Sequence, residues 1–212
     1  TWDDVHDLFE EETTEEIYQS SGISTVVVDE DEILSGNIFR SIRARTPWLF
    51  ITLIGEFIAV NVGNHFDHTL QALPIIAIFM PLLAGLGGNI GTQSITLMVR
   101  GLSTGQITVA SAVHHILREA CIGLFIGTIF GVLVTLVCWG WQHSKALGAV
   151  VGLAMAINMT IATVIGTFTP FALKAMKVDP AVASGPVIAT TIDVLGLAIY
   201  FTLVSTFLIK VM

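Results

Sequence analysis

The stretch ATTIDVLGLAIY, residues 189–200, places one carboxylate, Asp193, inside an apolar run long enough to cross a lipid bilayer. A carboxylate at bilayer depth costs about 3 kcal/mol on insertion scales, and such residues usually face a bundle interior or a water-filled path. Asp193 is therefore a candidate functional residue. Most positions on its helical face are small or proline, which lets another backbone approach closely or leaves room beside a narrow pore. These positions are Pro186, Ala189, Thr190, Gly196, Leu197 and Tyr200.

The composition of the whole chain is that of a membrane protein. Its 212 residues are 53% hydrophobic and 12% charged, and a mean hydropathy of +0.80 lies outside the range of a water-soluble domain. Five apolar segments predict an all-α protein with five transmembrane helices, at about 48–62, 70–99, 120–141, 146–173 and 184–209. Seven of the nine Lys and Arg residues then fall on the side of the N-terminus. The positive-inside rule makes that side cytoplasmic and the C-terminus extracytoplasmic.

Two short regions precede the first span. Residues 1–32 hold twelve of the seventeen acidic residues and no Lys or Arg, which predicts an acidic cytosolic segment and linker. In residues 33–47, apolar side chains recur every four positions beside three arginines, a pattern typical of an amphipathic interfacial helix. The chain starts at Thr1 and no signal-peptide pattern follows, so we interpret it as part of a longer protein.

The second apolar segment is too long for a straight span. Thirty residues would form a helix of about 45 Å against a hydrocarbon core of about 30 Å, so the segment must tilt or break. A broken backbone is tolerated in a bilayer where it is buried in protein or lines a polar cavity. Asn89 and Gln93 share one helical face there and suit a cation path. The predicted break positions are Pro74 and Pro81 in the first half and Gly85, Gly87, Gly88 and Gly91 in the second.

Two further polar residues lie within predicted spans. Glu56 is near the middle of the first span, where it is either a second ion or proton site or a protonated carboxyl bonded to a neighbouring helix. The sequence leaves these two interpretations open. Asn158, in the fourth span, is predicted to form a hydrogen bond between helices.

The segments FMPLLAGLGGNIGTQSITLMVRGL at 79–102 and DPAVASGPVIATTIDVLGLAIYF at 179–201 closely resemble the MgtE family of magnesium channels. The resemblance implies a homodimer with five spans per chain and a pore on the two-fold axis, lined mainly by the second and fifth spans. Asp193 matches the pore aspartate, and Ala189 matches a position whose backbone faces the ion. Gly185 stands where some relatives carry an asparagine, which removes a side-chain ligand. The pore-lining candidates are Gly185, Pro186, Thr190, Gly196, Gly87, Gly88, Asn89 and Gln93.

The resemblance also implies an activity and its regulation. Hydrated Mg²⁺, with Mn²⁺ or Co²⁺ as further candidate ions, would pass through a plasma-membrane protein into the cytosol, gated by cytosolic Mg²⁺. The opening residues look like the tail of a cystathionine-β-synthase (CBS) domain, so most of the cytosolic N and CBS domains would be missing. Residues 33–47 occupy the place of the connecting, or plug, helix. The regulatory Mg²⁺ candidates are Glu11, Glu12, Glu15 and Glu16.

Other functions were weighed against a channel. An ion-coupled secondary transporter of divalent cations would use the same residues, with Glu56 or Asp193 as the coupling site. An intramembrane hydrolase is disfavoured because the spans offer neither a second carboxylate with suitable flanks nor a nucleophile elbow. A passive membrane anchor leaves the broken polar span unexplained. The interpretation is therefore a transporter rather than an enzyme, with the bilayer and a second copy as partners and no role for nucleic acid.

Overall fold

The computed structural model describes residues 17, 21–22, 38–180 and 185–208. All the regular structure between residues 38 and 208 in these ranges is helical. Five stretches are long and apolar enough to cross a membrane, as predicted: Ile38–His65, Pro74–Ser103, Val109–Gln142, Lys145–Ala175 and Gly185–Phe207. The elements are α3 (Ile38–His65), α4 (Asp67–Ala72), η1 (Pro74–Phe79), α5 (Met80–Ser103), η2 (Val109–Ser111), α6 (Ala112–Gln142), α7 (Lys145–Ala175) and α8 (Gly185–Phe207).

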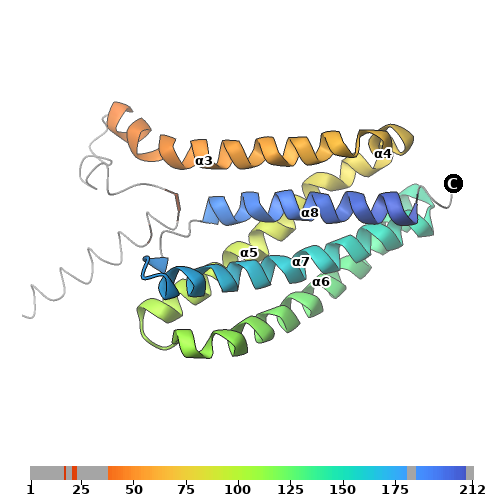
Figure 1. The fold of residues 1–212 in the computed structure, drawn as a ribbon. Helices are drawn as coiled ribbons and strands as arrows, with labels where there is room; N and C mark the ends of the chain where they lie inside the picture. The colour runs from red at the N-terminus through yellow and green to blue at the C-terminus, as the bar shows by residue number, and fades with distance from the viewer. Residues whose placement is uncertain (1–16, 18–20, 23–37, 181–184, 209–212) are drawn as a thin grey trace, which may run out of the picture.

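The helices form a bundle with α7 near its centre and α3 at one edge. In Figure 1, α3, α8, α7 and α6 follow one another across the molecule, and α5 crosses obliquely behind α8 and α7. More than half of the α7 span is buried, 56%, whereas only 6% of the α3 span is. Since α3 packs mainly on α8, almost all of its apolar surface is left for lipid or another protein.

The first span is longer than the apolar segment at 48–62. Helix α3 runs from Ile38 through Pro47 to His65 without interruption, so the predicted boundary at residue 47 is not a helix end. Most of the acidic segment 1–32 and the first part of the 33–47 helix lie outside the described residues. Their roles as a regulatory segment and a plug helix stay predictions.

The predicted break in the second span is confirmed at its prolines. Helix α4 ends at Ala72, Leu73 adopts φ −135° and ψ 71°, and a 3-10 helix from Pro74 to Phe79 leads into α5. The prediction that the glycines also break the span is wrong, because Gly85 to Gly91 lie in continuous α-helix. Gly87, Gly88 and Gly91 instead face atoms of α7 or α8 at close range, so they allow close helix packing.

Tyr200 of α8 attaches the 3-10 segment to the bundle. Its side chain is fully buried, and its hydroxyl donates a hydrogen bond to the Ile76 carbonyl at 3.0 Å. A 3-10 helix satisfies backbone groups less well than an α-helix, and the bilayer core holds no water to replace the missing partners. The hydroxyl therefore stabilises the irregular start of the second span.

We expect Tyr200→Phe to lower the free energy of unfolding by about 1–2 kcal/mol, because a buried carbonyl loses its donor. Thermal unfolding of the detergent-purified protein measures this change. Thr202→Val is the matched control: its exposed hydroxyl donates within its own helix, to Ala198 O, and the variant should unfold near the wild-type temperature. Equal losses in the two variants would contradict a special role for Tyr200.

Helices α6 and α7 form a hairpin whose backbones touch. The turn uses His143 in the left-handed conformation, φ 51°, and the Ser144 hydroxyl oxygen accepts a hydrogen bond from Leu147 N at 3.3 Å. A Cβ built on Gly127 would lie 2.8 Å from Ala156 O. The close approach therefore depends on residues without side chains at this seam.

Candidate functional site

Asp193 lies in the interior of α8 and is half-buried. Its Oδ1 atom is buried and has no hydrogen-bond partner among the described residues. Buried carboxylate oxygens are normally satisfied, so an unpartnered one calls for an explanation such as a bound cation or an ordered water. The carboxyl predicted from sequence to be functional is thus open to a ligand that the chain alone does not supply.

Helix α3 brings a second carboxyl to Asp193. One turn before Asp193, Thr190 packs so tightly on Gly55 that a Cβ at Gly55 would clash with the threonine methyl group. This contact fixes the register of α3 on α8, so that Glu56, the residue after Gly55, lies on the helix that packs beside Asp193. Glu56 itself is exposed. Two carboxyls in an apolar span repel each other unless one is protonated or a cation lies near them.

A polar stripe follows the exposed side of α5. Asn89 and Gln93 are both exposed and one turn apart, which confirms that they share a face. Thr96 and Arg100 continue it towards the end of the helix. Amide side chains facing hydrocarbon are costly because nothing there satisfies their hydrogen bonds. This face therefore calls for water or another protein surface.

The remaining pore-lining candidates lie in helix contacts within the chain. Gly87 and Gly196 face Asn158 of α7, and Thr190 faces Gly55 of α3. Gly185 is buried and Pro186 is partly buried. A Cβ at Gly88 would lie 3.3 Å from the Ala189 Cβ. Ala189 of α8 therefore lies against Gly88 of α5, the residue before Asn89.

The described residues contain no group of three or more His, Cys, Asp or Glu side chains placed to hold a metal ion. The regulatory candidates Glu11, Glu12, Glu15 and Glu16 lie outside those residues. No cluster of carboxylate, thiolate or imidazole ligands therefore surrounds Asp193 in the described part of one chain. A cation there would keep most of its water shell, as Mg²⁺ commonly does, or would take ligands from a second chain.

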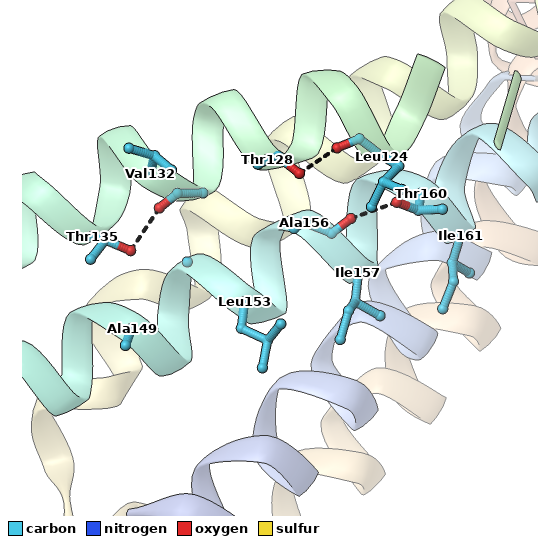
Figure 2. A pocket seen from close by; sticks show the side chains of 12 residues that line it. Leu124, Thr128, Val132, Thr135, Ala149, Leu153, Ala156, Ile157, Thr160 and Ile161 are labelled. Carbon is cyan, nitrogen blue, oxygen red and sulfur yellow. Dashed lines mark hydrogen bonds between the residues drawn. The ribbon is translucent and has the colours of Figure 1, made fainter. Parts of the chain in front are cut away.

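Two grooves on the described surface do not include Asp193. Figure 2 shows a groove of about 580 Å³ between α6 and α7, and another of about 590 Å³ between α3 and α8 is lined in part by Asn61 and His65. Neither is lined by Asp193 or Asn89. The hydroxyls in the first groove, those of Thr128, Thr135 and Thr160, lie within hydrogen-bond distance of carbonyls of their own helices (Figure 2), and that of Thr135 also of the Gly148 carbonyl of α7. That groove is therefore an apolar surface without free donors.

Sequence reasoning missed the buried carboxyl of Glu119. It lies on α6 with 5% exposure, and it accepts a hydrogen bond from the Ser94 hydroxyl of α5 at 3.0 Å. The third span was predicted to start at residue 120, which left Glu119 just outside it, whereas the observed span starts at Val109. An acid directly before an apolar run was the signal. Glu119 thus joins α6 to α5 through a buried hydrogen bond.

Comparison with known proteins agrees with the fold and the motifs. The family described as "MgtE: Divalent cation transporter" matches residues 80–203. The chain is 35% identical over 210 residues to the "Magnesium transporter MgtE" of Bacillus subtilis strain 168, covering 98% of this chain and 45% of that protein. It is 33% identical to the protein of the same name from Enterococcus faecalis, again covering 98% and 45%. For that of Thermus thermophilus the identity is 32%, covering 95% and 44%.

The chain spans somewhat less than half the length of the curated relatives it matches. The family match covers more than half of this chain and includes α5, α6, α7 and most of α8. It contains both Asp193 and the polar stripe of α5. A multi-pass helical membrane protein with these motifs is a transporter by family rather than an enzyme, and this chain belongs to the MgtE family of divalent cation transporters.

Proposed function

We propose that this chain forms the membrane pore of a magnesium transporter and that two copies build one pore. The observation that carries the proposal is Asp193, a half-buried carboxyl in the interior of an apolar span with one unpartnered oxygen. Two proteins that match 98% of this chain are named magnesium transporters. Mg²⁺ dehydrates reluctantly, so carboxylates would hold it through its waters rather than strip it.

The need for a second copy follows from what one chain leaves exposed. The Asn89 and Gln93 face of α5 is costly against lipid, and in the described residues no group of three or more His, Cys, Asp or Glu side chains surrounds Asp193. A second copy, related by a two-fold axis beside α5 and α8, would cover the Asn89 and Gln93 face. It would also double the number of carboxylates near the ion. Such a ring of two carboxylates would attract divalent cations and repel anions.

The proposed direction and control of transport rest on the charge pattern. By the positive-inside rule, the arginine-rich start of α3 supports a cytoplasmic N-terminus, and ions would then enter the cytosol at that end. The acid-rich residues 1–32 would bind cytosolic Mg²⁺, which neutralises their mutual repulsion and favours a closed arrangement. The residues proposed for this control are Glu11, Glu12, Glu15 and Glu16.

A coupled carrier is the second candidate, and Glu56 favours it. A carboxyl that interacts with Asp193 could exchange a proton with the ion site. Purified protein in liposomes, loaded with a Mg²⁺ indicator, tests both functions. We expect Mg²⁺ influx down its gradient without Na⁺ or a proton gradient, and unitary currents in planar bilayers. Flux that requires Na⁺ or H⁺ would favour the carrier, and no divalent flux would overturn both.

A further inference from the structure

Asn158 occupies the point where three helices meet. It projects from α7 and is 1% exposed, and its Nδ2 atom donates a hydrogen bond to the Leu83 carbonyl of α5 at 2.9 Å. This confirms the predicted hydrogen bond between helices. The contact links α7, the most buried span, to the first turn of the helix that carries the polar stripe.

Gly87 of α5 and Gly196 of α8 each place their backbone against the Asn158 amide group. A Cβ on Gly87 of α5 would lie 2.5 Å from Asn158 Nδ2, and one on Gly196 of α8 would lie 2.6 Å from Asn158 Oδ1. Real Cβ atoms essentially never approach other atoms so closely, so a side chain at either position would displace the amide group or the helix that carries the added side chain. The Asn158 amide therefore fills the space in which α5 and α8 approach α7 at this level.

The amide is not arranged for stability alone. Asn158 Oδ1 is buried and accepts no hydrogen bond in the described structure, and it faces the side of Gly196 where a Cβ would stand. An unsatisfied carbonyl costs free energy in a bilayer, and an apolar side chain of similar volume would remove that cost. The polar group thus calls for a role other than stabilising the fold.

The junction lies next to the groups assigned to the ion. Gly196 is three residues, less than one turn, beyond Asp193 on α8, and Gly87 is two residues before Asn89 on α5. Ile192, which precedes Asp193, packs directly on Gly87 and Gly91. A displacement of α8 at Gly196 would therefore move Asp193 relative to the polar stripe.

We propose that Asn158 is a positioning residue that holds α5 and α8 at the separation required for selective cation passage beside Asp193. The inference rests on the proposed function, and Asn158 itself does not contact the ion. Its amide acts as a spacer of fixed size, wedged between two glycines and secured by one hydrogen bond to α5.

A size-exchange experiment in the purified, reconstituted protein tests this role. Gly196→Ala adds a methyl group against the amide and should reduce Mg²⁺ flux about tenfold and lower the Mg²⁺ to Ca²⁺ flux ratio. Asn158→Ala creates the missing space, so the Asn158→Ala/Gly196→Ala double variant should recover flux to within about threefold of Asn158→Ala alone. Asn158→Leu keeps the volume without the amide and should fold while still changing the ion ratio.

Two controls separate positioning from a general loss of stability. Thr167→Val removes a different buried polar group of α7, a hydroxyl that lacks a partner in the described structure. Gly140→Ala adds a methyl group where nothing lies within 4 Å. Both should leave the ion ratio unchanged. Additive effects of the Asn158 and Gly196 changes, or an unchanged ion ratio in all Asn158 variants, would overturn the proposal.

Failure of the proposed function gives a different result. If the wild-type protein carries no divalent flux, that function is wrong, and the same double-variant cycle measured by thermal unfolding decides whether Asn158 sets the helix spacing. Coupling between the two sites supports the spacer, and additive changes in unfolding temperature overturn it.

Discussion

Replacing Asp193 with Asn should lower Mg²⁺ flux by one to two orders of magnitude. The substitution keeps the size of the side chain and removes its charge, and in a dimer it removes two charges at once. Opposite charges about 4 Å apart interact by roughly 4 kcal/mol at an effective dielectric constant of about 20, and a divalent ion doubles this. Part of that energy is offset by the retained water shell, which leaves a barrier change of about 1.4–3 kcal/mol. Initial influx into indicator-loaded liposomes is the measurement.

Three comparison variants define what Asp193 contributes. Asp193→Glu keeps the charge and should retain flux while changing the preference among divalent ions. Glu56→Gln should reduce flux only about twofold to fivefold, because Glu56 is exposed and acts on the ion site at longer range. Asp67→Asn changes an exposed carboxylate that accepts a hydrogen bond from Gln71 in its own helix. This variant should leave the flux unchanged. Flux in Asp193→Asn within twofold of wild type would refute the pore role.

Gly131→Val should produce a large loss of stability. A Cβ on Gly131 would lie 2.5 Å from Gly152 O and 3.2 Å from Gly152 C, so it meets backbone rather than a movable side chain. Helices α6 and α7 would have to separate along a seam that also includes Gly127 and Gly148. Overpacking costs about 1–3 kcal/mol, and a contact with rigid backbone belongs at or above the upper end.

Thermal unfolding in detergent measures this loss, and the same helix provides the control. Gly140 of α6 has nothing within 4 Å of its added Cβ, so Gly140→Val changes the same residue type without a clash. We expect Gly131→Val to unfold at a clearly lower temperature than Gly140→Val, which should stay close to wild type. Similar unfolding temperatures for the two variants would show that the backbones do not meet at Gly131.

The role of the glycines in the second span could not be predicted from the sequence. Gly85, Gly87, Gly88 and Gly91 were predicted to break the second span, but they lie within α5. A glycine in an apolar run permits either a bend or a close contact, and only the neighbouring helix decides between them. Gly87 and Gly196 are required by Asn158, which is distant from both in the sequence.

Asp193 and Glu56 also differ in how much the sequence alone indicated about them. Asp193 stood out from sequence because a charge in an apolar span is costly wherever the span packs. The pairing of Glu56 with it depends on the Gly55 to Thr190 contact, which joins the first and last helices of the described bundle. Glu119 was missed because its burial comes from tertiary contacts, such as the hydrogen bond from Ser94 of α5, rather than from its own apolar run.

The sequence by itself determined the five spans, the proline break before α5, the membrane setting and the choice of Asp193 as a candidate site. These depend on local properties: the length and hydropathy of a segment, the missing N–H of proline and the cost of a charge in lipid. Only the tertiary structure decided which helix each small residue touches, that Asn158 separates α5 from α8, and that α3 brings Glu56 to Asp193. Such contacts join residues far apart in the chain, and their energies depend on shape complementarity between helices, which no local pattern encodes.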